Sequence, residues 1–466
     1  MMRLPVISSS QRRLTSGCRC LFSLVVLSFL GIRDAFEVVT DLKQVHIIYR
    51  HGDRAPLRRY RNDNYDPKDW PEGLGNLTKQ GVEHQFLLGQ YFAARYARFL
   101  SVEHASHEVF IRASDHNRVL ESALANAAGM FPPTSGSMWN SSRNGTSLGE
   151  LWRPVPVHTV SQSEEFLLKQ TAACPKLKRL NRELYESPFL LSRHHEHMSS
   201  MGMLINEQAN DAGDHFFDRV LNAFDSYECL RLHNVSTPKW INGSVYEVLQ
   251  QISSEVFHSW SGTWGDGERA RLIGGHLLYT ILNRLQQKPT WPKLFIYAGH
   301  DSTISGLNAI LHMIAKSETA RDISAIPPFS ASVFVELFQN DSVRVLYHED
   351  WNSTADPVML SHPECHNSLC PLSKLIALSK DFIVVDWKDE CADLYYQYLH
   401  GHTLREPAGL WGIAVFIAIL VAIIVGALWW RRQKQLRFKG GNRGPVGAVV
   451  DPPVAYRTLE NQLQYQ

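Results

Sequence analysis

The sequence predicts an α/β protein with a parallel-rich central sheet flanked by helices, a smaller inserted helical domain and one transmembrane helix. Three short apolar runs, 45–49, 109–111 and 294–297, have the composition of buried strands, and a helix pattern follows each of them. Parallel strands joined through helices bring their carboxyl ends to one edge of the sheet, where ligands bind in open α/β folds. We therefore expect the residues that follow these runs to share one crevice.

The first run leads into the string Arg-His-Gly-Asp-Arg-Ala-Pro at 50–56, which places His51 between Arg50 and Arg54. Guanidinium groups meet phosphate oxygens with paired donors and stay charged at any working pH. Their positive potential disfavours protonation of the imidazole, which leaves a ring nitrogen free to attack phosphorus. The alternative is a solvated turn over a strand end that has no catalytic role. The length of the string favours a phosphate site with its own nucleophile.

The second and third runs end in similar polar residues. The second run ends at Arg112, and the third leads into His300 and Asp301. A carboxylic acid beside a departing alcohol lowers the barrier by proton transfer, typically by ~10²- to 10⁴-fold. Asp301 can instead cap the free backbone amides of a helix N-terminus, and the two roles can coexist.

These segments together resemble the histidine acid phosphatase family, in particular its lysosomal, prostatic and testicular branch, over about residues 38 to 395. The supporting strings, in the family's order, are 50–56, Leu-Thr-Lys-Gln-Gly at 77–81, Ile-Arg-Ala-Ser-Asp at 111–115 with Arg118, Pro-Val-His-Thr-Val at 156–160 and Gly-His-Asp-Ser-Thr at 299–303. The resemblance implies a phosphoglycerate mutase-like fold and a homodimer. It also implies phosphorylation of His51, proton donation by Asp301, and binding of the phosphoryl oxygens by Arg50, Arg54, Arg112 and His300.

The resemblance further implies an acid phosphatase that converts small phosphate monoesters to an alcohol and orthophosphate through a phosphohistidine. Because Asp301 must begin protonated and His51 neutral, we expect an acidic rate optimum. Two other hypotheses remain, a phosphatase specialised for inositol phosphates, lysophosphatidate or nucleotides, and a catalytically idle membrane receptor on the same scaffold. A receptor could lose catalytic side chains freely, whereas this chain keeps all six.

The expected reaction needs no cofactor and no metal. The sequence has no His-Glu-x-x-His, no Cys-x-x-Cys and no Gly-x-x-x-x-Gly-Lys phosphate loop. The histidines at 194, 195 and 197 can bind zinc weakly, but without partners elsewhere we interpret them as a solvated polar patch. The net charge is +1 and no basic tract lies between residues 34 and 407, so nucleic acid is not an expected partner.

The N-terminal segment has the features of a secretory signal. Residues 21–32 form an uncharged apolar run after a stretch with several arginines, which predicts a signal peptide over residues 1–33. No clean small-x-small pair marks the cleavage point, so Gly31 and Ala35 are both candidates for processing. An uncleaved anchor is the alternative.

A second apolar segment, 408–430, predicts a single-pass type I membrane protein. This segment has no charge and is long enough to cross ~30 Å of hydrocarbon as a helix. Basic residues follow at once, which orients the tail 431–466 to the cytosol and residues 34–407 to the lumen. Asn-x-Ser/Thr glycosylation acceptors lie in the lumenal part at Asn76, Asn140, Asn144, Asn234, Asn242, Asn340 and Asn352.

The tail bears on where the protein resides. Its glycines and prolines predict disorder, and Tyr456 begins a tyrosine-x-x-leucine string of the kind that clathrin adaptors read. The lysosomal member of the family is similar in carrying a tyrosine signal. We therefore expect a lysosomal membrane protein with a lumenal catalytic domain, and the plasma membrane or an endosome is the alternative.

The lumenal part contains five cysteines, an odd number. The resemblance implies disulfides Cys174–Cys391 and Cys365–Cys370, which suit an oxidising compartment. It leaves Cys229 as a free thiol, because the family partner would fall near Ser332. Between about residues 162 and 255 polar helical segments replace the strand-like runs, and the family architecture implies a smaller helical domain that covers the crevice.

Overall fold

The computed structural model describes residues 41–392 and 419–434, apart from 102–104, 134–151, 171–172, 264–266, 288–291, 316–325, 353–357, 361, 363, 366–368 and 433. Residues up to Leu394 belong to one compact unit and residues from Tyr395 onward to a second. The predicted signal peptide and the predicted adaptor motif at Tyr456 lie outside the described residues.

A mixed β-sheet runs through the first unit. In the described residues its strand order is β3-β2-β4-β1-β5-β6-β7, and β8 pairs with β6. The strands are β1 (Leu42–Arg50), β2 (Val109–Ala113), β3 (Val157–His158), β4 (Leu294–Gly299), β5 (Ser332–Phe338), β6 (Ser342–His348), β7 (Val358–Leu360) and β8 (Cys370–Pro371).

Only one half of this sheet is parallel. Strands β1 to β4 pair in parallel, and their register places the first and second predicted runs on either side of the third. Strands β5 to β8 pair antiparallel, with β5 alongside β1. A turn of three residues joins β5 to β6, and so short a connection can only make an antiparallel pair. The expected parallel-rich sheet is therefore correct for the half that carries the three runs, and the whole sheet is mixed.

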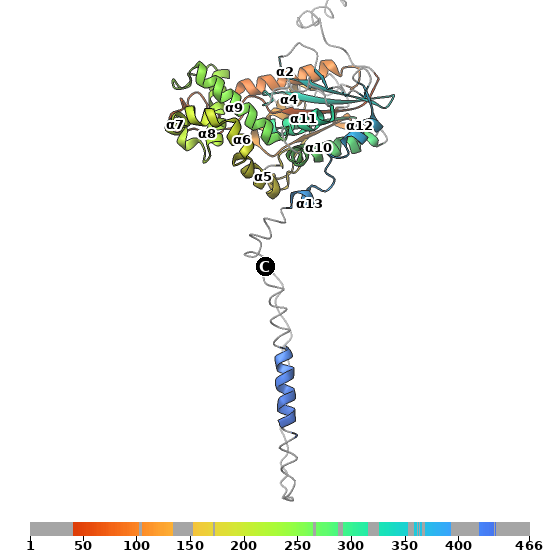
Figure 1. The fold of residues 1–466 in the computed structure, drawn as a ribbon. Coiled ribbons are helices and arrows are strands. Elements are labelled where there is room, and N and C mark those ends of the chain that lie inside the picture. The colour runs from red at the N-terminus through yellow and green to blue at the C-terminus, as the bar shows by residue number, and fades with distance from the viewer. Residues whose placement is uncertain are drawn as a thin grey trace, which may run out of the picture. The chain divides into compact units, whose positions relative to one another are not determined.

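Helices cover both faces of the sheet (Figure 1). The flanking helices are α2 (Lys79–Arg95), α4 (Asn117–Met130), α10 (Glu268–Gln286) and α11 (Asp301–Ala315). Ile47 of β1 belongs to a buried cluster with Leu88 of α2, whereas its neighbour Ile48 belongs to a cluster with Leu307 of α11. Successive residues of a strand point to opposite faces, so α2 and α4 cover one face and α10 and α11 cover the other.

A helical region follows β3 along the chain. Its helices are α5 (Pro175–Tyr185), α6 (Pro188–Arg193), α7 (His195–Ala209), α8 (Phe216–Leu232) and α9 (Gly243–Ser261), and Figure 1 shows α7, α8 and α9 side by side, beyond one end of the sheet. The region has its own buried cluster, which includes Phe217 and Leu249. His194 is buried beside Phe217, so its assignment to a solvated patch was wrong. The limits of an inserted domain at about 162 and 255 stay a prediction.

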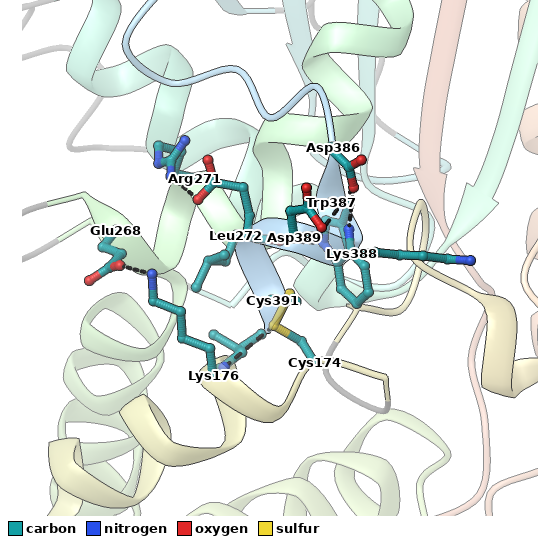
Figure 2. The surroundings of a disulfide bond; sticks show 12 residues. Cys174, Lys176, Glu268, Arg271, Leu272, Asp386, Trp387, Lys388, Asp389 and Cys391 are labelled. Atoms are coloured by element: carbon teal, nitrogen blue, oxygen red, sulfur yellow. Dashed lines mark hydrogen bonds and ion pairs between the residues drawn. A yellow bond between two sulfur atoms is a disulfide. The ribbon is translucent and has the colours of Figure 1, made fainter. Parts of the chain in front are cut away.

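Shorter elements complete the first unit: α3 (Ala105–Glu108), η2 (Gln162–Glu164), η4 (Asn210–Ala212), α12 (Leu372–Ser379) and α13 (Trp387–Cys391). Both disulfides that the resemblance implied are present, Cys174–Cys391 and Cys365–Cys370. Figure 2 shows that the first of them joins the start of α5 to the end of α13, where ion pairs also connect these two helices to α10. Among the described residues, Cys229 is a buried free thiol, as expected.

In the second unit, residues 419–432 and residue 434 are helical. Within the part of the chain that the structure describes, we find no helix with both the length and the apolar character that a membrane crossing requires. Residues 408–418 of the predicted membrane span lie outside the described residues.

Candidate active site

The carboxyl ends of β1, β2 and β4 meet at one edge of the sheet. The backbone N–H of His51 donates to the Gly299 carbonyl (3.0 Å), and that of Ser114 donates to the Ala298 carbonyl (3.2 Å). The hydroxyl of Ser114 lies 2.8 Å from Nε2 of His300, and the ring centroids of His51 and His300 are 5.6 Å apart. The crevice expected from the sequence is therefore formed by these three strand ends.

His51 lies at the centre of this crevice and is buried. Its Nδ1 is 2.8 Å from the Gly52 carbonyl oxygen, which can only accept, so Nδ1 carries the proton and Nε2 carries the lone pair. Nε of Arg118 donates to this Nε2 (3.2 Å). Burial, followed by the charges of Arg118, Arg50 and Arg54, lowers the pKa of His51 well below its usual value. The ring is therefore a neutral imidazole with a nucleophilic nitrogen among three guanidinium groups.

The start of α2 fixes the loop that carries this histidine. Thr78 caps α2 by accepting from the N–H of Gly81 (3.1 Å), and its own N–H donates to the Asp53 carbonyl (3.0 Å). A Cβ on Gly81 would lie 2.1 Å from that same carbonyl oxygen, so only glycine permits the close approach. Gln85 donates to the Arg50 carbonyl (3.1 Å). These contacts give the string at 77–81 a structural role.

Arg50 and Asp301 form a pair across the crevice. Arg50 Nη2 lies 3.1 Å from Asp301 Oδ2, and the guanidinium stacks 4.1 Å from the centroid of the Phe329 ring. Burial acts to raise the pKa of Asp301, but Arg50, Lys169 and other cations outweigh it and hold the pKa well below its usual range. The carboxyl is thus ionised in the free site, which differs from the expectation that Asp301 begins protonated. The physical reason is the surplus of positive charge around it.

Arg54 is held by the helical region. Its guanidinium binds both carboxylate oxygens of Asp225 in α8 (2.7 and 3.1 Å), and Nη1 lies 3.6 Å from the sulfur of Cys229. Burial disfavours the charged guanidinium, yet Asp225 more than compensates and raises the pKa of Arg54. Sequence analysis missed Asp225, because no local pattern relates a helix residue to an arginine so far away in the chain.

The structure separates two arginines that lie close together in sequence. Nη2 of Arg112 in β2 is 2.7 Å from Oε2 of Glu165, and Nη1 donates to the Ala113 carbonyl. Arg118, in the first turn of α4, instead contacts the nucleophile. The sequence analysis assigned phosphate binding to Arg112 and quoted Arg118 without a role. The available signal was the position of Arg118 at the start of the helix that follows β2.

Two further polar side chains lie beside His300. The ring of His116 meets it edge-on at 4.8 Å, and burial together with the charges of Arg118 and Lys169 lowers the pKa of His116 to about 4. Nζ of Lys169 donates to Oγ of Ser302 (3.3 Å). Neither residue belongs to a sequence motif, so neither was foreseen.

A cavity of about 540 Å³ opens from this site toward the helical region. Arg50, Arg54, Lys169 and Asp301 line its polar end. Most of its remaining wall is apolar or aromatic and comes from α5, α8, α9 and the segment before β5, with Tyr185, Phe224, Tyr246, Phe257, Trp260 and Phe329. In the described ranges, no cluster of His, Cys, Asp and Glu side chains has a geometry that could hold a metal ion.

The chain is similar to known proteins in sequence and in fold. Residues 41–348 match the model of the histidine phosphatase superfamily, branch 2. The chain is 33% identical over 358 residues to prostatic acid phosphatase of Mus musculus, with 75% of this chain and 89% of the relative covered. It is 31% identical over 403 residues to lysosomal acid phosphatase of Homo sapiens, with 85% and 89% covered.

Solved structures support the fold alone. The phytase of Hafnia alvei in complex with tartrate aligns with a TM-score of 0.53 at 15% identity, covering 75% of this chain and 98% of the phytase. The phytase of Klebsiella sp. ASR1 aligns with a TM-score of 0.54 at 15% identity, covering 76% and 97%.

Proposed function

This chain belongs to branch 2 of the histidine phosphatase superfamily, and we propose that it is an acid phosphatase that acts through a phosphohistidine at His51. Its similarity to lysosomal and prostatic acid phosphatases over most of its length supports hydrolysis of phosphate monoesters. The observation that carries the mechanism is the tautomer of His51, because the Gly52 carbonyl fixes the proton on Nδ1 (2.8 Å) and leaves Nε2 to attack.

In the first half-reaction, Arg50, Arg54, Arg118 and His300 hold the phosphoryl oxygens. Arg118 takes the place that the sequence analysis gave to Arg112, since its Nε lies 3.2 Å from the attacking nitrogen. The guanidinium groups stabilise negative charge on the phosphoryl group in the transition state. Nε2 of His51 forms a bond to phosphorus as the bond from phosphorus to the ester oxygen breaks.

Asp301 acts as the general acid of the first half-reaction and as the general base of the second. It protonates the leaving oxygen, and in the second half-reaction it takes a proton from the water that opens the phosphohistidine. A bound phosphoryl group cancels part of the positive charge that keeps Asp301 ionised in the free site. The monoanionic form of the ester brings the proton with it, and this form prevails below about pH 6. An acidic optimum follows from substrate protonation.

The cavity supports broad tolerance for the leaving alcohol. Its wall is mostly apolar and aromatic, so few of its groups can form hydrogen bonds with a polar alcohol. Arg231, one of the cations on this wall, is already bound to Glu228 (2.7 Å). Specialisation for inositol polyphosphates is less well supported, because additional phosphates need additional unpaired cations. An apolar lysophosphatidate chain or a nucleotide base remains compatible with the wall.

We also propose a lysosomal location, in line with the similarity to lysosomal acid phosphatases. In this proposal residues 1–33 direct secretion, residues 408–430 anchor the chain, the tail binds a clathrin adaptor at Tyr456, and the lumenal part forms a homodimer. The plasma membrane or an endosome is the alternative location. A Tyr456→Ala variant should lose lysosomal delivery in cell fractionation, and unchanged delivery would remove the proposed adaptor motif.

The activity is tested with the full chain in detergent. An aryl phosphate should be hydrolysed fastest at acidic pH, and EDTA should have little effect. His51→Ala should abolish turnover, whereas an active His51→Ala protein would exclude the covalent mechanism. An inactive wild type would instead favour the receptor hypothesis.

A further inference from the structure

Lys169 lies beside the residue that handles the proton. It belongs to the segment between η2 and α5, and it lines the same cavity as Asp301. Its ammonium group donates to Oγ of Ser302 (3.3 Å), the residue that follows Asp301 in the first turn of α11. This hydrogen bond fixes the ammonium group on the helix end that carries the carboxyl.

Lys169 also differs from the other cations of the cavity wall in its pairing. Each of the three arginines has a carboxylate within ion-pair distance: Arg50 has Asp301, Arg54 has Asp225 and Arg231 has Glu228. Among the described residues of this wall, Lys169 has no carboxylate within such a distance. Burial disfavours its charge and lowers its pKa. An unpaired, partly buried ammonium group is costly, which suggests a role in the reaction rather than in the fold.

The charged or titratable groups that face Asp301 come from several elements. Arg50 lies at the end of β1, Arg54 in the following loop, Arg118 in α4 and His300 next to Asp301 itself. The arginines also bind the phosphoryl group in the proposed mechanism, so substrate binding offsets their effect on the carboxyl. Lys169 does not bind the phosphoryl group in that mechanism, so its charge continues to act on Asp301 when substrate is bound.

We propose that Lys169 is a positioning residue of the proton-transfer step, whose ammonium group, fixed on Ser302, favours the ionised form of Asp301 and so sets the pH at which Asp301 exchanges its proton in the substrate complex and in the phosphoenzyme. The inference rests on the proposed function, because it assigns to Asp301 the exchange of a proton with the leaving alcohol and with water. A cation near a carboxyl lowers the pH at which that carboxyl accepts a proton. Removing the cation should therefore let Asp301 act as an acid at higher pH.

The test follows both half-reactions of the full-length protein against pH. The burst of alcohol in the first turnover reports Asp301 as the acid, and the decay of the phosphoenzyme reports it as the base. In Lys169→Met, the falling limb of the burst rate and the rising limb of the decay rate should both move up by about one pH unit. Lys169→Arg should keep both limbs at their wild-type positions.

Lys178→Met is the matched control, since Lys178 is exposed on α5 and should leave both limbs unchanged. Limbs that do not move in Lys169→Met, in a protein that still unfolds at the wild-type temperature, would overturn the inference. A falling limb that moves to lower pH with a raised KM would overturn it too, because Lys169 would then bind the phosphate directly. If the wild type releases no alcohol from an aryl phosphate, the proposed function itself fails.

Discussion

At the scale of single residues, chemistry depends on which atom each side chain leaves unbound. His51 has two ring nitrogens, and the Gly52 carbonyl occupies one of them at 2.8 Å. The other nitrogen contacts Arg118 at 3.2 Å, a position that a phosphoryl group can enter by displacing that hydrogen bond. One backbone carbonyl therefore decides which nitrogen attacks.

Two neighbouring arginines should respond differently to replacement. We expect Arg118→Ala to lower kcat/KM by about 10²-fold or more, because it removes a donor to the phosphoryl group. Arg112→Ala should mainly reduce stability, by about 3–5 kcal/mol, because it leaves the buried carboxylate of Glu165 without its ion-pair partner. Steady-state kinetics and urea unfolding of both variants separate the two effects. A larger kinetic loss in Arg112→Ala would return that residue to the phosphate site.

The pH dependence should follow the substrate on the alkaline side. The pKa of His51 lies well below its usual value of 6.5, so its imidazole is already neutral at mildly acidic pH. As pH rises through about 6, the ester loses its second proton and kcat/KM should fall. A pair of aryl phosphates with different second pKa values should shift that falling limb accordingly. An acidic limb of kcat/KM near pH 6.5 that is caused by deprotonation of His51 would contradict the account.

At the scale of elements, the helix that follows the first strand positions the nucleophile loop. Gly81 lets the first turn of α2 contact the Asp53 backbone, and His84 of the same helix binds the Asp53 carboxylate (2.6 Å). The loop is therefore supported by backbone and side-chain contacts from one helix end. Small changes there should affect catalysis without touching a site residue.

A pair of glycine substitutions tests this support. Gly81→Ala places a Cβ 2.1 Å from the Asp53 carbonyl oxygen, so it should cost about 1–3 kcal/mol of stability and reduce kcat/KM about tenfold or more. Gly202→Ala in α7 meets no atom within 4 Å and should be neutral or stabilise by up to about 1 kcal/mol. Equal effects of the two substitutions on kcat/KM would contradict the role of α2.

The strand ends explain how far the sequence could predict the site. Arg50, His51, His300 and Asp301 follow apolar runs directly, and parallel pairing of β1 and β4 brings them together. Arg112 also lies near a strand end, and the alternation of a strand does not say whether Arg112 or Arg118 points into the crevice. Asp225 and Lys169 come from segments without strand periodicity, so only tertiary packing places them. The antiparallel half of the sheet was not anticipated, because the sequence analysis sought strands with helices behind them.

At the scale of the molecule, the disulfide Cys174–Cys391 closes the longer of the two disulfide loops in the described residues. Cys174 and Cys391 are separated by 217 residues, and their bond joins the helical region to the end of the first unit. The span includes strand β4 and most of the cavity wall. The bond therefore restricts the unfolded chain over much of its length.

Removal of the two disulfides should have unequal effects. Cys174→Ala with Cys391→Ala should lower the free energy of unfolding by about 2–5 kcal/mol, because a long loop is released. Cys365→Ala with Cys370→Ala opens a loop with a sequence separation of 5 and should cost less. Thermal unfolding of both pairs under oxidising conditions provides the comparison. The reverse order of stability losses would show that loop length does not govern these bonds.

The central claim, a covalent phosphohistidine, is tested most directly by trapping it. The Asp301→Ala variant should form the adduct with a good leaving group and hydrolyse it slowly, so rapid quenching with a ³²P-labelled aryl phosphate should label the protein. The account predicts an acid-labile, base-stable label on Nε2 of His51, lost in a second variant that also carries His51→Ala. A label on another residue, or its persistence without His51, would contradict the account.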